Sequence, residues 1–282
     1  MDRTVLITGS SSGIGRATAE AFLDEEWAVY ATARDPDDVA DLADREGCTA
    51  AELDVTDEGD VERVVDRMTD AEGRIDCLVN NAGYGQFGPV EDVPVSTARR
   101  QYEVNVHGVH RLVREVLPHM REREDGTIVN LSSVAGRIAF PGGGAYCGSK
   151  FALEAMSDAL RAEVDPYGVD VVLVEPGPVA TGFRERAEQE VEGDGETGGL
   201  DRSGAYESFY EVFGDARFIG GDGPGSVPPE RVADVVVNAA SATRPRARYP
   251  VGTLARLTVL GRFVPDAWRD RLFALADRLA GR

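Results

Sequence analysis

Two kinds of apolar pattern alternate along the chain, and their order predicts the architecture. Short apolar runs are typical of strands buried on both faces, and apolar residues spaced three or four apart are typical of helices that cover a sheet. The predicted strands are Val5–Ile7, Ala28–Ala33, Ala50–Leu53, Cys77–Val79, Ile128–Leu131 and Val171–Val174. The predicted helices are Ile14–Glu25, Asp37–Arg45, Glu58–Ala71, Ser96–Glu124 (with interruptions near Gly108 and Pro118), Ala145–Asp165 and Arg231–Ala240. This alternation predicts an α/β fold, a parallel sheet with helices on both faces.

The pattern loosens after Gly182. Residues 183–229 are rich in glycine and acidic residues, and the aromatic residues Tyr206, Phe209, Tyr210 and Phe213 follow helical spacing within them. One interpretation is a short helix packed on the body by an aromatic stripe. The other is a lid over a substrate pocket, because long loops in compact domains are often active-site lids. We expect one domain over residues 1–282, with 183–229 as a substrate-lid insertion.

Residues 244–282 are expected to form a C-terminal helical extension. Amphipathic helical spacing is clearest around Trp268, Leu272, Phe273, Leu275 and Leu279. The preferred interpretation is a helix that caps the core, and the alternative is a helix that lies on a membrane surface.

Composition favours a cytoplasmic protein. The 282 residues suit one large domain, and 42% hydrophobic residues can fill its core. No apolar run approaches the roughly 18 residues of a membrane span, and the N-terminal residues read as a strand, not as a signal peptide. The three cysteines are odd in number and widely spaced, which indicates free thiols in a reducing compartment.

The charge balance narrows the range of partners. Asp and Glu total 50 against 30 Lys and Arg, a net charge of −20, which repels nucleic acids and anionic membranes. Lys150 is the single lysine. An acidic surface poor in lysine resembles proteins of salt-loving organisms, in which salt screens the self-repulsion. Arginine cannot replace Lys150 where a compact ammonium with an adjustable pKa is required.

A glycine-rich turn joins the first predicted strand to the first helix. Its sequence, Thr8-Gly9-Ser10-Ser11-Ser12-Gly13-Ile14-Gly15, lets the backbone approach a pyrophosphate at a helix N-terminus. Its position in the first βα unit predicts nucleotide binding by a Rossmann-type doubly wound sheet in three α/β/α layers.

The residues after the second strand bear on the choice of nucleotide. Ala33 occupies the strand end, and Arg34 and Asp35 follow it. An arginine here accommodates the 2′-phosphate of NADP, whereas an acid usually binds the ribose of NAD. We therefore favour NADP(H), with NAD(H) as the alternative if Asp35 contacts the ribose. Both residues also suit a solvated helix entry.

Further polar residues follow other strands. Asp54-Val55 come after the third strand and Asn80-Asn81-Ala82-Gly83 after the fourth, at the edge where open α/β sheets bind ligands. Asp and Asn are also ordinary turn residues. Ser132 and Ser133 end the fifth strand, where a hydroxyl can orient a substrate oxygen.

The most specific feature is the segment Tyr146-Cys147-Gly148-Ser149-Lys150. Residues four apart share a helix face, so the Lys150 ammonium is expected to lower the pKa of Tyr146 from about 10. Tyr146 would then be a general acid for carbonyl reduction or a base for alcohol oxidation. The histidines, His107, His110 and His119, lie on one helical stretch without metal-ligand spacing, so we expect no metal site.

Together these motifs resemble the short-chain dehydrogenase/reductase family, in order and in register over roughly residues 3–182. The resemblance is carried by Thr8 to Gly15, Asn80 to Gly83, Asn105, Ser133, Tyr146, Lys150 and Pro176-Gly177. The Gly-x-x-x-Gly-x-Gly spacing resembles the shorter-chain branch, and the segments around Val29–Arg34 and Tyr146 resemble the hydroxysteroid and retinol dehydrogenases.

The resemblance implies a catalytic set of Ser133, Tyr146 and Lys150, with Asn105 holding a water that relays protons to Lys150. It also implies a bulky apolar alcohol or ketone as substrate and a homodimer or homotetramer built from the Ser96–Glu124 and Ala145–Asp165 regions. The predicted cofactor contacts are Thr8, Gly9, Ser11, Ser12, Gly13, Ile14, Gly15, Arg34, Asp54, Val55, Asn81, Ala82, Gly83, Tyr146, Lys150, Pro176, Gly177, Val179 and Thr181.

Two other functions remain open on the sequence alone. One is a redox sensor that binds nucleotide without turnover, and the other is a lyase or epimerase that does not consume its nucleotide. The Tyr146/Lys150 pair argues against the sensor, and the glycine spacing argues against the epimerase.

Overall fold

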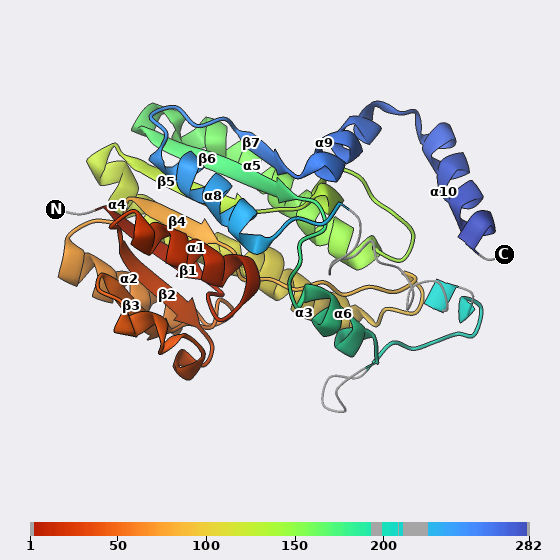
Figure 1. Cartoon of the computed structure of the whole chain (residues 1–282), viewed down its shortest axis with the longest axis horizontal. Coiled ribbons are helices and arrows are strands. Elements are labelled where there is room, and N and C mark those ends of the chain that lie inside the picture. The colour runs from red at the N-terminus through yellow and green to blue at the C-terminus, as the bar shows by residue number, and fades with distance from the viewer. Residues whose placement is uncertain (1–2, 193–198, 208, 211–224, 281–282) are drawn as a thin grey trace.

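The computed structural model describes residues 3–192, 199–207, 209–210 and 225–280. Seven strands form one parallel sheet in the order β3-β2-β1-β4-β5-β6-β7 (Figure 1). They are β1 (Thr4–Thr8), β2 (Ala28–Ala33), β3 (Cys48–Glu52), β4 (Cys77–Asn80), β5 (Gly126–Leu131), β6 (Val169–Pro176) and β7 (Arg248–Val251). The chain order reverses between β3-β2-β1 and β4-β5-β6, so the predicted doubly wound sheet is confirmed, and its topological switch point lies between β1 and β4.

The seventh strand was not predicted, because β7 lies in the tail that we expected to be helical. It pairs in parallel with β6, with Pro250 opposite Glu175. Pro250 cannot donate to a ladder and is tolerated here because β7 is an edge strand. Four residues that include a proline and an arginine make no apolar run, so the pattern does not reveal the strand.

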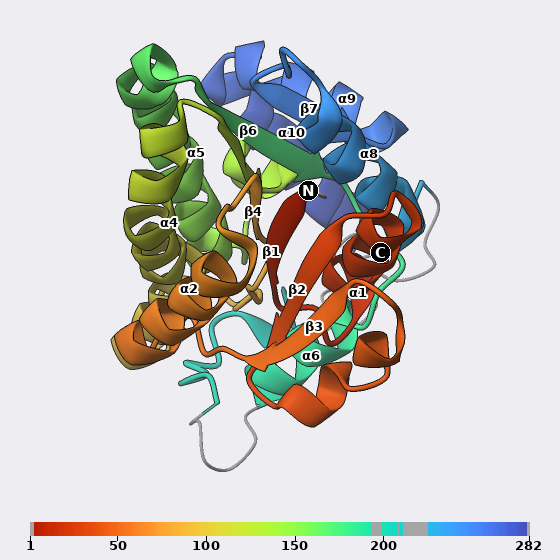
Figure 2. The ribbon, with the colours of Figure 1, turned by 90° about the vertical axis from the view of Figure 1, so that its left-hand side faces the viewer.

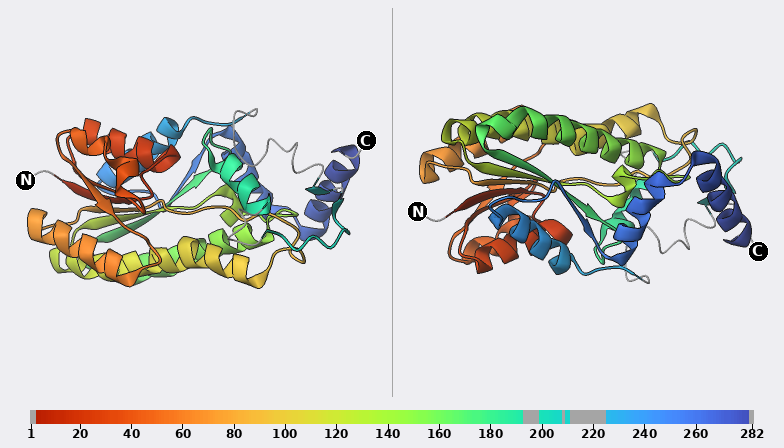
Figure 3. Two further views of the ribbon diagram at one scale, coloured as in Figure 1. Left: turned by 90° about the horizontal axis from the view of Figure 1, so that it is seen from below. Right: turned by 90° about the horizontal axis from the view of Figure 1, so that it is seen from above.

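Helices cover both faces of the sheet and enclose two apolar cores (Figures 2 and 3). α1 (Gly13–Asp24) and α8 (Pro229–Ser241) pack on one face, where Phe22 and Val236 are fully buried. On the other face lie α2 (Glu58–Glu72), α4 (Val109–Arg123) and α5 (Gly144–Val164). These layers confirm the predicted α/β/α arrangement.

Two helix predictions need correction. Asp37–Arg45 is not one helix but two short 3₁₀ turns, η1 (Pro36–Val39) and η2 (Leu42–Asp44), each of which buries one apolar residue. The Ser96–Glu124 stretch is α3 (Val95–Tyr102), the π-helical η3 (Glu103–Gly108) and then α4. The interruption near Gly108 is confirmed, but Pro118 lies inside α4 without ending it.

The region after β6 has two parts. α6 (Phe183–Glu192) begins the predicted lid insertion and buries Ala187 and Val191. Tyr210 of the aromatic stripe packs against the same cluster, whereas Phe213 lies outside the described residues. The short turns η4 (Val134–Gly136) and η5 (Asp165–Tyr167) flank α5.

The tail forms α9 (Thr253–Leu260), η6 (Gly261–Phe263) and α10 (Asp266–Ala280). α9 buries Ala255 completely, but Trp268 on α10 is 65% exposed. Figure 1 shows α10 standing away from the sheet and its helices. The prediction that the tail caps the core is therefore wrong for α10.

Candidate active site

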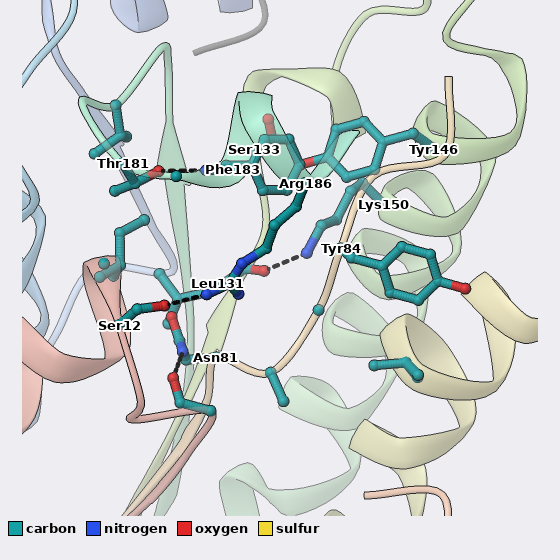
Figure 4. Close-up of a pocket in the computed structure, with 18 of the residues that line it drawn as sticks. Ser12, Asn81, Tyr84, Leu131, Ser133, Tyr146, Lys150, Thr181, Phe183 and Arg186 are labelled. Carbon is teal, nitrogen blue, oxygen red and sulfur yellow. Dashed lines mark hydrogen bonds between the residues drawn. The ribbon is translucent and has the colours of Figure 1, made fainter. Parts of the chain in front are cut away.

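A cleft of about 850 Å³ opens at the carboxyl ends of the parallel strands. Residues from the ends of β1, β2, β4, β5 and β6 meet there, as expected for an open α/β sheet (Figure 4). The predicted site residues that line it are Gly9, Ser11, Ser12, Gly13, Ile14, Arg34, Asp54, Val55, Asn81, Ala82, Gly83, Ser133, Tyr146, Lys150, Pro176, Gly177, Val179 and Thr181. The structure thus brings most of the predicted residues to one cavity.

The glycine-rich turn runs from β1 into the N-terminus of α1. Gly9 and Gly13 have φ values of +70° and +55°, a region that favours glycine. A Cβ on Gly15 would lie 2.1 Å from the Gly9 carbonyl oxygen, so glycine is required for this close packing. Ser12, Gly13 and Ile14 line the cleft, so the N-terminus of α1 adjoins it, and the free N–H groups of a helix N-terminus suit a phosphate.

Thr8 and Gly15 lie behind the wall of the cleft and do not line it. Thr8 Oγ1 accepts hydrogen bonds from the backbone N–H groups of Asn81 (3.1 Å) and Ala82 (3.0 Å). Asn81 Nδ2 donates to the Thr8 and Gly9 carbonyls at 2.9 Å. In this structure Thr8 therefore ties the ends of β1 and β4 together, and its predicted cofactor contact has no surface in the cleft.

The two residues after β2 have different surroundings. Arg34 is exposed and lines the cleft. Asp35 caps η1, where its Oδ1 accepts a hydrogen bond from the Asp37 N–H at 3.0 Å. Asp54 also lines the cleft, and its Oδ1 accepts hydrogen bonds from the Thr56 N–H and hydroxyl.

Asn105 is buried in the π-helical segment η3, and it too does not line the cleft. Its Nδ2 donates to the Tyr84 carbonyl (2.9 Å) and to Ser149 Oγ (3.1 Å), and its Oδ1 accepts from the Tyr84 N–H. Asn105 thereby connects the loop after β4 to the residue that precedes Lys150. The amide already has these partners, so the predicted water relay stays a prediction.

Ser133 and Tyr146 are held together at the cleft, and their side chains are hydrogen-bonded. The Ser133 Oγ also accepts from the Ala135 N–H at 3.1 Å, which fixes the start of η4. Ser132 also lines the cleft, but its buried Oγ lies near Gly136 and has no hydrogen-bond partner among the described residues. This geometry agrees with the choice of Ser133 over Ser132.

Burial is the largest cause of the pKa shift of both Tyr146 and Lys150. Burial raises the pKa of Tyr146 to about 12, which the hydrogen bond with Ser133 opposes. Burial also lowers the pKa of Lys150 to about 8, which the nearby Glu154 opposes. The Lys150 ammonium donates to the Leu131 carbonyl at 2.8 Å and lies 6.0 Å from the centre of the Tyr146 ring. The expected lowering of the tyrosine pKa is therefore wrong for this structure, because the ammonium faces a carbonyl and not the phenol oxygen.

An aromatic wall adjoins Tyr146. Phe87 and Phe183 lie 5.2 and 5.7 Å from the Tyr146 ring, centre to centre, and Phe140 stacks on Phe87 at 6.4 Å. These side chains come from the loops after β4 and β5 and from α6, so the topology brings together residues that have no sequence periodicity. Sequence reasoning did not identify any of them.

A cation on α6 was also missed. Arg186 lines the cleft, and its Nη2 donates to Ser12 Oγ at 2.6 Å, across the mouth of the cleft from the glycine-rich turn (Figure 4). No motif marks this arginine, since it lies among charged residues that follow an ordinary helical pattern. Its contact with the glycine-rich turn is evident only from the fold.

Charge in the cleft differs from charge in the whole chain. The charged residues that line it are Arg34, Arg100, Lys150, Arg186, Asp54, Glu103 and Glu190. Cations therefore outnumber acids here, whereas acids predominate by 50 to 30 in the whole chain. Such a cleft attracts an anion to a protein that otherwise repels anions.

A cluster of charged residues lies behind Lys150. Arg137 and Arg248 each contact both Glu154 and Glu175, at 3.0 to 3.4 Å. Glu154 is one helical turn after Lys150, Glu175 belongs to the end of β6, and both are almost fully buried. Burial, together with the nearby Glu154 carboxylate, raises the pKa of Glu175 to about 7. The cluster connects α5, which carries Tyr146 and Lys150, with the end of η4, β6 and β7.

The described residues also bear on three other possibilities: a metal site, a disulfide and a membrane-spanning helix. Within the described ranges, no group of three or more His, Cys, Asp or Glu is placed to hold a metal ion. The three cysteines are free thiols, as predicted. No helix in the described part of the chain is long and apolar enough to cross a bilayer.

Comparison with known proteins agrees with this geometry. Residues 3–192 match the short chain dehydrogenase family. The chain is 33% identical to the NADPH-dependent 3-dehydrocapnine reductase of Ornithobacterium rhinotracheale, over 96% of each chain. It is 36% identical to human 17-beta-hydroxysteroid dehydrogenase type 1, over 88% of this chain and 77% of the human protein.

Among solved structures, a short-chain dehydrogenase from Streptomyces avermitilis superposes with a TM-score of 0.80 at 34% identity. The alignment covers 100% of this chain and 98% of the other. The chain therefore belongs to the short-chain dehydrogenase/reductase family. It is an oxidoreductase of the kind that uses a nicotinamide cofactor to interconvert alcohols and carbonyls.

Proposed function

We propose that this protein transfers a hydride between NADP(H) and an apolar alcohol or ketone. The observation that carries the proposal is the meeting of Ser133, Tyr146 and Lys150 with the glycine-rich turn and the aromatic wall in one cleft. A nucleotide-binding redox sensor would not need the catalytic set beside a substrate-sized apolar surface.

The residues of the cleft fit the cofactor. Glycines open the turn at the N-terminus of α1, and four cationic side chains gather in an otherwise acidic protein. The nicotinamide supplies or accepts the hydride. Tyr146 Oη gives a proton to the carbonyl oxygen or takes one from the alcohol, and Ser133 Oγ orients that oxygen. Lys150 would hold the nicotinamide ribose, and its ammonium lies 6.0 Å from the centre of the Tyr146 ring. Positioning of this kind contributes much of the rate.

The different surroundings of Arg34 and Asp35, the two residues after β2, favour NADP(H) over NAD(H). Arg34 faces the cleft, while the Asp35 carboxylate is engaged as the cap of η1. A free arginine suits the 2′-phosphate, and a capping aspartate is less available for ribose hydroxyls. Arg186, which bonds Ser12 over the turn, is placed to exchange that hydroxyl for a pyrophosphate oxygen.

The first test is nucleotide binding by nicotinamide fluorescence, with NADPH and NADH compared on each variant. Arg34→Ala should weaken NADPH roughly tenfold to a hundredfold and leave NADH unchanged, because a charge-assisted contact is worth about 1.5–3 kcal/mol. Arg186→Gln should weaken both nucleotides by similar factors, since both carry the pyrophosphate.

Asp35→Asn is the matched control, because asparagine keeps the cap of η1 while it removes the charge. It should leave NADH affinity unchanged. A loss of NADH binding in Asp35→Asn, with no effect of Arg34→Ala on NADPH, would assign the cofactor as NAD. Binding of neither nucleotide by the folded wild type would refute the enzyme proposal.

The substrate is proposed to be apolar and bulky. Support comes from the wall of Phe87, Phe140 and Phe183 beside Tyr146. One relative is named as a 17-beta-hydroxysteroid dehydrogenase and another as a 3-dehydrocapnine reductase. We also propose that residues 183–229 form the substrate lid, because α6 brings Phe183 and Arg186 into the cleft. A homodimer or homotetramer through α4 and α5 remains our expectation.

A further inference from the structure

Large apolar side chains are exposed on the tail. Leu257, Leu260, Phe263, Trp268 and Leu275 are each more than half exposed, and Phe263 reaches 79%. All lie on α9, η6 or α10. In the rest of the described chain, exposed large apolar residues are scattered over separate elements, as is normal for a protein surface.

The exposed residues of α10 follow one side of the helix. Trp268 and Leu275 are seven positions apart, which places them on the same face two turns from each other. Arg271 borders this face, because it lies three positions after Trp268 and four before Leu275. Arg269 lies on the other flank, where it pairs with Asp266 at 2.8 Å. An apolar face with tryptophan and leucine, flanked by arginines, is typical of a helix that lies in a lipid–water interface.

The tail carries the opposite charge from the rest of the molecule. Residues 253–280, which form α9, η6 and α10, hold five arginines and three aspartates, whereas the whole chain holds 30 basic and 50 acidic residues. A basic segment on a strongly acidic protein marks a surface selected for an anionic partner.

The tail also lies at the end of the molecule that holds the cleft. α9 packs beside Gly177, at the end of β6, and Gly261 of η6 lies against Ile138 in the loop after Ser133. Figures 1 and 3 place α10 beyond the carboxyl ends of the strands, at the end opposite the N-terminus. Whatever covers the tail is therefore brought close to the mouth of the substrate cleft.

We propose that α9, η6 and α10 bind the surface of an anionic lipid bilayer, with the mouth of the cleft toward the membrane. Arginines meet the headgroups, and Trp268, Leu275 and Phe263 enter the boundary with the acyl chains. This inference goes beyond the proposed reaction and does not depend on it. An apolar substrate dissolved in the bilayer would then enter the cleft without crossing water.

A second copy of the chain is a poorer occupant. A symmetric contact between two tails would bring arginine-rich segments against each other. A contact between the tail and the body would require an apolar patch on the body. Outside the tail, the large apolar residues exposed in the described chain are few: Val90 in the loop before α3, Val95 on α3, Phe151 on α5 and Tyr167 on η5.

The test uses vesicles and the tryptophans of the chain. There are two tryptophans; Trp27 is 3% exposed in the core, so a change of emission on binding reports Trp268. The protein is mixed with phosphatidylglycerol or phosphatidylcholine vesicles at the lowest salt at which circular dichroism shows it folded. We expect cosedimentation and a blue shift of emission with phosphatidylglycerol, and neither with phosphatidylcholine.

Variants separate the apolar contribution to vesicle binding from the contribution of the arginines. Trp268→Ser with Leu275→Ser should abolish cosedimentation, while Val95→Ser, an equally exposed apolar residue on α3, should not change it. Arg269→Gln with Arg271→Gln should lower the affinity roughly tenfold, at about 1 kcal/mol per charge. Arg114→Gln, an exposed arginine on α4, is the matched control.

Three results would overturn the proposal. One is the absence of binding to anionic vesicles by the folded wild type. Another is binding that the Trp268→Ser/Leu275→Ser variant retains in full. The third is an oligomer, seen by light scattering, that this variant dissociates while no form binds vesicles, because a second copy would then cover the face. None of these outcomes depends on nucleotide binding, so they are distinct from a failure of the proposed reaction.

Discussion

Tyr146 and Lys150 share one buried wall of the cleft, and burial acts on them in opposite directions. The tyrosine, with a pKa raised to about 12, stays protonated at neutral pH and is ready to donate. The lysine, with a pKa lowered to about 8, is close to losing its charge. A bound anion beside the ammonium would raise the lysine pKa again, so cofactor binding and lysine charge are coupled.

This coupling predicts a pH dependence of nucleotide affinity. Below pH 8 the free protein presents an ammonium to the anionic cofactor, and above pH 8 it presents a neutral amine. The Kd for NADPH should therefore rise with pH between 8 and 9.5, by up to about tenfold per unit. Fluorescence titrations across this range should show the rise in the wild type and not in Lys150→Met. Parallel curves for the two proteins would show that Lys150 does not carry the effect.

At the residue scale, motif residues could be predicted from sequence, but their partners could not. Gly9, Ser133, Tyr146 and Lys150 carry local signals and line the cleft. Arg186 has no such signal, because it lies 174 positions after Ser12 in the sequence and meets it only in the folded chain. The lysine's effect on the tyrosine was mispredicted because helical spacing gives proximity but not the direction of the ammonium.

Ion pairs as well as apolar packing hold α5, the helix that carries Tyr146 and Lys150, to its neighbouring elements. Arg137, after η4, and Arg248, on β7, both hold Glu154 of α5 and Glu175 of β6. Burial, and after it the repulsion from the Glu154 carboxylate, raises the pKa of Glu175 to about 7, so this carboxyl holds its proton near neutral pH. β7 therefore contributes to the site, although it is a short edge strand far from the glycine-rich turn.

The cluster predicts that Glu175→Gln changes the pH dependence of stability. A carboxyl whose pKa is raised in the folded state binds its proton more tightly there, so its contribution to stability is present at low pH. It is lost as pH rises from about 4.5 to 7. Relative to wild type, Glu175→Gln should gain stability over this window, roughly 3 kcal/mol at most.

Melting temperatures at pH 5 and 7.5 would check this, with Glu163→Gln, an exposed acid on α5, as the control. A Glu175→Gln variant that is less stable than wild type by the same amount at both pH values would contradict the prediction. It would show that the ionised carboxylate is favourable in its cluster.

The elements could be predicted where burial imposes a period. β2 begins and ends where the apolar run does, and α2 differs by one residue from its predicted end. β7 was missed, and η1 and η2 were predicted as one helix, because such short segments bury too few side chains to show a reliable period. The exposed apolar face of α10 follows the same helical period as the buried face of a core helix. Spacing alone therefore cannot tell whether the apolar face of a helix is buried or exposed.

At the scale of the whole molecule, charge is divided between regions. The body carries most of the acidic residues, whereas the cleft and the tail are comparatively rich in arginine. Self-repulsion within the body opposes the folded state and is screened by salt. We therefore expect anions to be attracted to the cleft and the tail and to be repelled by the rest of the surface.

The acidic body predicts salt-dependent stability. Raising salt from about 0.2 M to 2 M should increase the melting temperature by roughly 5–10 °C, or about 2–3 kcal/mol, as screening reduces the repulsion. Differential scanning fluorimetry would measure this, and a neutral osmolyte at the same osmolality would separate screening from general exclusion. An unchanged melting temperature in salt would remove the argument for a salt-adapted protein.

Lys150 is the single lysine of the chain, and only 7% of it is exposed, within the cleft. Reagents that acylate or reductively alkylate lysine side chains usually decorate a protein at many points on its surface. Here they have one side-chain amine to attack, and its pKa near 8 makes it nucleophilic at mildly alkaline pH. The number of labels per molecule would therefore report the fraction of molecules whose cleft is accessible. A bound nucleotide would lower that number by protecting the Lys150 amine.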